Sequence, residues 1–179
     1  DIELNFDKLR NLKKNIKING LIKDLKIDLL NKYKIDKTNL IFNYEFNNLN
    51  LKDIDFRLND IKFDSNEIKL KKTQNNFEIE GKFRNDFFEL NKNHIKLMIQ
   101  PLFPNIKIEK VRLNSKSTFN LNLNKRYKIE KFKIFSDINL DELIVSNHLE
   151  FKRFFTKIKE KISFLKNKIS IDYSNENLK

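Results

Sequence analysis

Apolar residues in the middle of the chain recur at every second position. Ile54, Phe56 and Leu58 alternate with charged or polar neighbours, and the same alternation returns at 61–63, 68–70 and 77–83. A strand with one buried face requires this two-residue period. The pattern therefore predicts successive β-strands between residues 54 and 83.

Short polar segments separate these apolar sets. They are Asn59-Asp60, Asp64-Ser65-Asn66 and Gln74-Asn75-Asn76. Asn and Asp tolerate left-handed backbone, and they hydrogen-bond their own turns. We therefore expect antiparallel hairpins that follow one another along the chain.

The alternation extends in both directions. After Pro101 and Pro104 it predicts further short strands, and an odd spacing at Lys131 indicates a bulge or turn. The predicted strands outside the middle lie at 16–18, 25–29, 40–46, 106–108, 111–113, 119–123, 127–129, 132–134, 138–140 and 169–173.

Two segments have helical spacing instead. Between about 150 and 162, five apolar residues recur three or four positions apart among lysines, which predicts a short amphipathic helix: Phe151, Phe154, Phe155, Ile158 and Ile162. A second helix is expected at 91–99, where Ile95, Met98 and Ile99 share a face before Pro101.

Together these elements predict a mainly β fold. We expect an extended antiparallel meander, or curved sheet of repeated hairpins, with an open apolar groove and one or two short amphipathic helices. Residues 1–179 form one β-rich segment, with a possible break near 98–105. Because strand stacks on strand in such an array, its core is a continuous apolar face.

The net charge of +12 suggests an anionic partner. Only six of the 37 basic residues are Arg, however, whereas specific phosphate and base contacts favour the planar guanidinium. The lysine excess indicates a solvated surface, and a basic β module that binds single-stranded nucleic acid ranks second.

The composition offers few of the residues that catalytic sites use. The chain has no Cys, and its two histidines, His94 and His148, lie far apart without metal-ligand spacing. Its two glycines, Gly20 and Gly81, cannot form a phosphate-binding loop. We expect no metal, no cofactor and no enzymatic activity.

The boundaries of the chain predict a piece of a longer protein. It begins with Asp1, its single Met is Met98, and no stretch approaches the roughly 20 apolar residues of a membrane span. Any membrane anchor is expected outside this segment.

Three parts of the sequence resemble the β-rich repeats of the bacterial AsmA-like superfamily, including its YhdP-like members. They are Leu49-Asn-Leu-Lys-Asp-Ile-Asp-Phe56, the pair Asn66–Leu70 and Phe77–Phe83, and Ser136–Leu143 ahead of Phe154-Phe155. The resemblance covers most of residues 16–173.

The resemblance implies an internal segment of a periplasmic protein, anchored to the inner membrane through a part of the protein not in this chain. Its groove would conduct phospholipid toward the outer membrane, with neighbouring β-repeats of the same longer chain as partners. Acyl chains would then contact alternate apolar residues, namely Phe56, Leu58, Leu70, Phe77, Ile79, Phe83, Phe119, Leu121 and Leu123.

Two alternatives differ in their use of the same surface. A nucleic-acid module would stack bases on aromatic rings along an exposed face. A purely structural repeat would have its apolar face filled rather than open.

Overall fold

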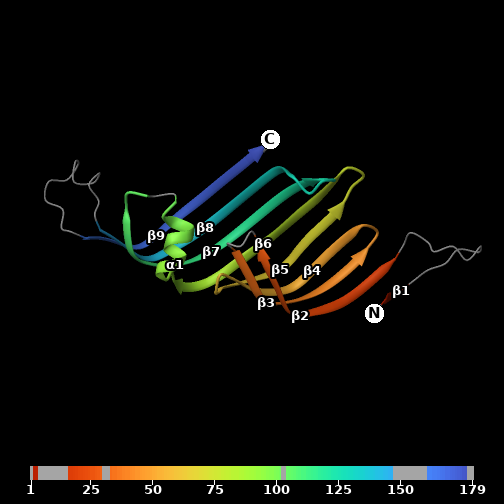
Figure 1. Ribbon diagram of the computed structural model, residues 1–179, viewed down its shortest axis with the longest axis horizontal. Coiled ribbons are helices and arrows are strands. Elements are labelled where there is room, and N and C mark those ends of the chain that lie inside the picture. The colour runs from red at the N-terminus through yellow and green to blue at the C-terminus, as the bar shows by residue number, and fades with distance from the viewer. Residues whose placement is uncertain (1, 4–15, 30–32, 102–103, 147–160, 177–179) are drawn as a thin grey trace, which may run out of the picture. The chain divides into compact units, whose positions relative to one another are not determined.

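A computed structural model describes residues 2–3, 16–29, 33–101, 104–146 and 161–176. Its strands form one sheet in sequential order from β1 to β9, in which consecutive strands from β1 to β6 pair antiparallel (Figure 1). The predicted mainly β meander is confirmed. The elements are β1 (Ile2–Glu3), β2 (Lys17–Leu29), β3 (Tyr33–Glu45), β4 (Asn48–Leu58), β5 (Ile61–Lys72), β6 (Asn76–Glu89), α1 (Lys92–His94), η1 (Ile95–Ile99), β7 (Lys107–Asn124), β8 (Ile129–Ser146) and β9 (Lys161–Glu176).

The strands are longer than the alternation predicts. β7 and β8 each run for 18 residues without a break, including the position of the expected bulge or turn at Lys131, and β2 continues through Gly20. The prediction of several shorter strands in these segments was wrong. Small polar side chains such as Ser117 and Ser136 take inward positions, where they are buried and hydrogen-bond to each other at 2.8 Å. The alternation of apolar residues is interrupted at these serines, but the strands themselves continue through them.

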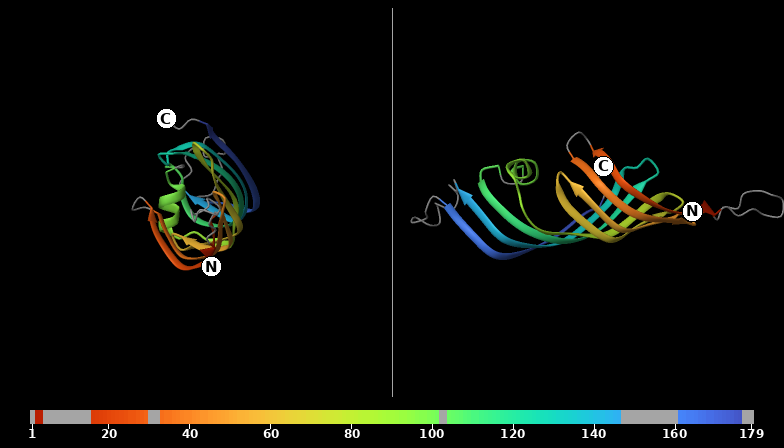
Figure 2. Two further views of the ribbon diagram at one scale, coloured as in Figure 1. Left: turned by 90° about the vertical axis from the view of Figure 1, so that its right-hand side faces the viewer. Right: turned by 90° about the horizontal axis from the view of Figure 1, so that it is seen from below.

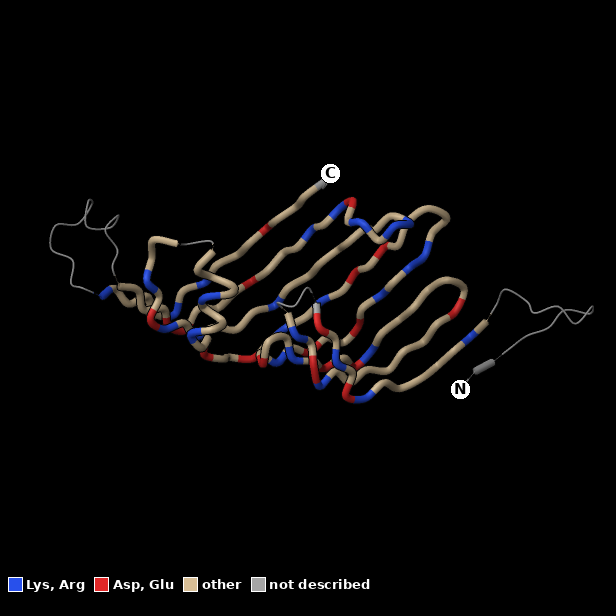
Figure 3. Tube along the Cα trace, in the orientation of Figure 1, with Lys and Arg blue, Asp and Glu red and all other residues tan. Residues whose placement is uncertain are grey.

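Two residues join β3 to β4 and β4 to β5, three join β5 to β6, and four join β7 to β8. Asn59 and Asp60 have φ of 48° and 70°, as the sequence predicted. In the turn at 73–76, the backbone and hydroxyl of Thr73 donate hydrogen bonds to the Asn76 carbonyl, and the Thr73 hydroxyl accepts one from the Asn76 backbone. A further left-handed turn at Phe46-Asn47 was missed, because Phe46 extends the strand alternation. The turns at 46–47, 73–76 and 125–128 lie along one rim of the strands (Figure 3).

The expected turn at Asp64-Ser65-Asn66 was wrong, because these residues lie inside β5. The ladder with β6 instead shifts register between Asp64 and Ile68. A bulge inserts one extra residue, so that apolar side chains three positions apart stay on one face. Similar three-residue steps occur at Ile22/Leu25 in β2 and at Leu51/Ile54 in β4, and Figure 1 shows β2 bending sharply at its middle.

Tertiary contacts divide the chain into two compact units. Unit 1 comprises 1–84, 116–136 and 171–179, and unit 2 comprises 85–115 and 137–170. The strands β6 to β9 pass from one unit to the other, so both units are built from the same meander. Among the described residues, the buried apolar side chains of unit 1 are those of Leu40, Ile54, Ile61 and Phe63, and those of unit 2 belong to Leu90, Ile95, Val111, Leu140 and Val145.

Unit 2 contains the predicted helix at 91–99, which is confirmed as α1 followed by η1. The Asn91 side chain accepts a hydrogen bond from the His94 backbone at 2.9 Å, and the His94 ring accepts one from the Asn91 backbone. His94 and Ile95 are buried, and the helix lies over the inner face of the unit 2 strands (Figure 2). The other predicted helix, at about 150–162, lies outside the described residues except for Lys161 and Ile162, which begin β9.

No helix among the described residues is both long enough and apolar enough to cross a membrane.

Candidate apolar binding face

The predicted lipid-facing residues lie on one face of unit 1, as the registers of β4 to β6, the contact of Phe83 with Phe119 and the alternation along β7 indicate. Phe56 pairs with Phe63, Leu70 with Ile79, and Ile68 with Gly81, so all of these point to the same side of the sheet. All nine predicted residues belong to unit 1, and each is partly exposed, neither buried nor fully open to solvent. We call this surface the apolar face. It also carries residues that the prediction did not assign to it, although their alternation signals them: Ile18, Ile22, Leu40, Phe42, Leu51, Ile54, Ile61, Phe63 and Ile68.

Four phenylalanine rings form a continuous row across the apolar face. Phe56 stacks on Phe63 with ring centroids 5.4 Å apart, and Phe63 meets Phe83 edge-on at 5.7 Å. Phe83 in turn contacts Phe119 at 5.9 Å. The row crosses β4, β5, β6 and β7, which at the usual strand spacing is about 14 Å. The apolar face is therefore unbroken in the direction across the strands.

The glycine in β6 gives one of these rings its position. A Cβ added at Gly81 would lie 2.8 Å from Ile68 Cγ1 and 3.0 Å from Phe119 Cε1. The ring of Phe119 thus packs directly against the backbone of the neighbouring strand. Gly20 has the same role beneath the ring of Phe42, its cross-strand partner.

Within the described part of unit 1, no second layer covers the apolar face. All described residues of that unit lie in strands of the one sheet or in the turns between them. Curvature alone buries the residues nearest the bend, where Ile54 is 4% exposed and Phe63 is 8% exposed. Away from the bend, the side chains of the face keep part of their surface open.

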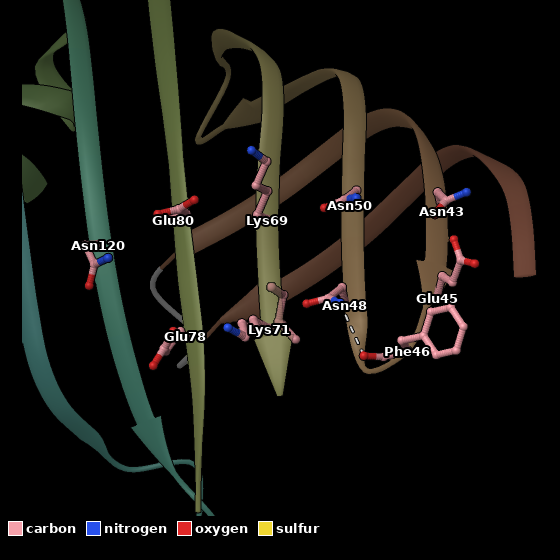
Figure 4. A pocket seen from close by; sticks show the side chains of 11 residues that line it. Asn43, Glu45, Phe46, Asn48, Asn50, Lys69, Lys71, Glu78, Glu80 and Asn120 are labelled. Carbon is pink, nitrogen blue, oxygen red and sulfur yellow. Dashed lines mark hydrogen bonds between the residues drawn. The ribbon is translucent and has the colours of Figure 1, made fainter. Parts of the chain in front are cut away.

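The opposite face of unit 1 exposes Leu21 and Ile41 at β2 and β3, and it is polar where β3 to β6 line a hollow (Figure 4). Asn43, Asn50, Lys69 and Glu80 lie in register across four strands, beside a second row with the order Glu45, Asn48, Lys71, Glu78. Together with Phe46, Leu70 and Asn120 these residues line a hollow of about 430 Å³. Because each Lys of the two rows pairs with a Glu of β6, the hollow has no run of positive charge for a phosphate backbone.

Further polar contacts lie near the bend, on the face opposite the apolar face. The Asn39 side chain donates to Asp55 at 2.9 Å, and Arg84 pairs with Asp64 at 2.6 Å. Asp55 and Asp64 are themselves cross-strand partners, so the contacts link β3 to β6. Pairing with Arg84 relieves the repulsion between the two carboxylates.

Two surface groups of unit 2, Glu109 and Lys110, have pKa values shifted by ion pairing. A hydrogen bond from Lys161, whose Nζ lies 2.6 Å from the carboxylate, lowers the pKa of Glu109. A hydrogen bond to Glu142 raises the pKa of Lys110. Both pKa shifts arise because the contacts stabilise the charged forms. This is typical of structural ion pairs rather than of groups that transfer protons near neutral pH.

Among the residues that the structure describes, no group of three or more His, Cys, Asp or Glu side chains could hold a metal ion. The buried His94 caps α1, and its described contacts are those of a structural residue.

Comparison of the chain with protein-family models, with curated proteins and with solved structures gives no match.

Proposed function

We propose that the chain is a non-catalytic segment of a lipid-handling protein, and that the apolar face of unit 1 holds phospholipid acyl chains. The observation that supports this proposal is the gathering of all nine predicted residues on one continuous, partly exposed face. In the setting we propose, the segment belongs to a periplasmic protein that is anchored to the inner membrane elsewhere. Its groove would shield or conduct phospholipid toward the outer membrane.

The energetics favour an acyl chain as occupant. A lipid tail that leaves a bilayer loses about 0.8 kcal/mol for each methylene exposed to water, and any apolar surface that covers it recovers part of this. The row from Phe56 to Phe119 spans about 14 Å. One leaflet of the hydrocarbon core is about 15 Å thick. The face is therefore wide enough to cover most of one chain.

The sheet also offers pairing sites for neighbouring repeats. β9 is the last strand in the sheet order, and among the described residues only Ile2 and Glu3 of β1 pair with the outer edge of β2. Unpaired strand edges bind further strands readily. Repeats of the same longer chain would extend the apolar face by adding strands at these edges.

Native mass spectrometry with lipid extraction of the purified chain tests the proposal, run beside a salt-titrated assay with single-stranded RNA. Copurifying phospholipid without RNA binding is the expected result. Lipid-free protein that binds RNA with a steep salt dependence would overturn the proposal. It would indicate that the net charge of +12 serves to bind nucleic acid.

A further inference from the structure

Two exposed aromatic residues of unit 1 occupy the tips of turns in left-handed backbone. Phe46 has φ of 48° and is 59% exposed, and Tyr127 has φ of 57° and is 71% exposed. Left-handed positions of tight turns normally carry Gly, Asn or Asp, because a bulky side chain is disfavoured there. Both residues therefore combine an unfavourable backbone with an unfavourable exposure, which points to a contact outside the chain.

The turns that carry these rings lie on the same rim. Alternate turns of a meander fall at the same edge of the strands, and Figure 3 shows them side by side. The backbone N–H of Lys72 donates to the Asn47 carbonyl at 2.9 Å, and the Asn76 side chain donates to Glu130 at 3.0 Å. We call residues 46–47, 72–76 and 125–128 the turn rim.

Tyr127 is held in place by the turn around it. The Asn124 side chain accepts from the backbone of Arg126 at 2.9 Å and of Lys128 at 3.1 Å, and the Asn124 carbonyl accepts from Tyr127 at 2.9 Å. The Tyr127 ring stacks on Phe77 with centroids 5.2 Å apart. The ring is thus preorganised at the tip.

The turn rim is positively charged. It contains Lys72, Lys125, Arg126 and Lys128, and it contains no Asp or Glu. The Lys72 ammonium lies 5.9 Å from the centroid of Phe77, so cations and rings form one cluster. Glu130, which follows the rim, is the acceptor of the Asn76 side chain.

We infer that the turn rim binds the surface of an anionic phospholipid bilayer. Aromatic rings partition to the interface between headgroups and acyl chains, and lysine and arginine beside them attract anionic headgroups. The rim supplies both from three adjacent turns. The apolar face begins at the same edge, with Leu70, Phe77 and Leu123 near the ends of their strands. Binding of the rim to a bilayer does not depend on what occupies that face, but transfer of a lipid onto the face rests on the proposed function.

The arrangement of the rings favours a bilayer over a nucleic acid. Phe46 and Tyr127 stand on separate turns, whereas stacking platforms place their rings along one strand-lined groove. The strands that lead to the rim carry Glu45, Glu78 and Glu80 among their lysines. Cations are therefore concentrated at the edge, where a flat anionic surface reaches them.

Vesicle cosedimentation of the full chain tests the inference. The vesicles are phosphatidylcholine alone or an equal mixture of phosphatidylcholine and phosphatidylglycerol. Each basic residue near an anionic surface strengthens binding roughly fivefold. The triple variant Lys125→Gln, Arg126→Gln, Lys128→Gln should therefore bind the mixed vesicles roughly a hundredfold more weakly.

A matched control carries Lys23→Gln, Lys52→Gln and Lys62→Gln, which lie in unit 1 away from the rim and remove the same net charge. It should bind nearly as well as the parent. The double variant Phe46→Asn, Tyr127→Asn should also bind more weakly, at least tenfold. Because Asn tolerates left-handed backbone, this variant should keep or raise the urea midpoint, so that unfolding does not explain the loss.

Three outcomes would overturn the inference: failure of the parent chain to bind mixed vesicles, equal losses in the rim and control triples, or rim-dependent binding to single-stranded RNA without binding to vesicles. Lipid copurification in the native spectrum is a separate readout. It can succeed when vesicle binding fails, and the two proposals are therefore tested independently.

Discussion

A single carboxylate placed on the apolar face should block acyl-chain binding. Leu121 lies on that face between Phe119 and Leu123 in β7, and it is partly exposed. Leu121→Asp removes one apolar contact and introduces a charge that the bound chain would have to desolvate. Because the side chain is not part of the buried core, the folded state should tolerate the change.

The size of the effect follows from two contributions. Full burial of a leucine side chain contributes about 1.5–3 kcal/mol, and a partly exposed one gains roughly half of that when a ligand covers it, about 1 kcal/mol. Desolvation of the carboxylate adds at least about 1.5 kcal/mol. The sum of about 2.5 kcal/mol corresponds to a roughly seventyfold rise in Kd.

The assay is fluorescence titration with a phospholipid that carries a fluorophore in its acyl chain. Asn120→Asp is the matched control, because it adds the same charge one position away in β7, on the polar face. The control should bind as the parent does. Below the usual Asp pKa of about 3.9, the Leu121→Asp carboxyl is neutral and should recover part of the affinity. Equal affinities for Leu121→Asp and Asn120→Asp at neutral pH, with both variants folded, would refute the reasoning.

Three further predictions concern stability, measured as urea midpoints. Gly81→Ala should lower the free energy of unfolding by about 1–3 kcal/mol, because the new Cβ displaces the Phe119 ring. Lys37→Gly should raise it by up to about 1 kcal/mol, since φ is 49° at Lys37. Glu109→Gln should lower the midpoint at neutral pH. Because Lys161 lowers the pKa of Glu109, this contribution is present above the unfolded value of about 4.3 and is lost as pH falls through the folded pKa, where parent and variant should converge.

Each of these has its own check. Lys62→Gly, in the extended backbone of β5, should be destabilised by roughly 0.5–1 kcal/mol, in contrast to Lys37→Gly. An unchanged midpoint for Gly81→Ala would show that Phe119 does not pack on the glycine. A Glu109→Gln deficit that stays constant down to acid pH would exclude the ion pair as its cause.

The sequence was sufficient to predict the meander and the membership of the apolar face. Alternation within the sets 54–58, 68–70 and 77–83 assigns these apolar residues to one side of their strands, and the registers of β4 to β6 agree. Even the bulges are visible as three-residue steps, such as Leu51 to Ile54, in an otherwise two-residue period. At Asp64-Ser65-Asn66 the polar residues within such a step predict a turn, because they resemble one.

The remaining features depend on tertiary context. Ser117 and Ser136 keep their strands continuous through cross-strand pairing, which no local pattern reveals. The turn at Phe46-Asn47 contradicts residue preference, because neighbouring strands fix its position against the cost of a left-handed phenylalanine. For the same reason the turn rim could not be predicted: its rings and cations come from three separate parts of the chain.

The most direct test of an acyl chain on the apolar face is photo-crosslinking with a phospholipid that carries a diazirine in its tail, followed by peptide mapping. We predict that crosslinks fall on apolar-face residues such as Phe56, Phe83 and Leu121. Crosslinks on the polar face, at Asn43 or Lys69, or a distribution indifferent to the two faces, would contradict the account.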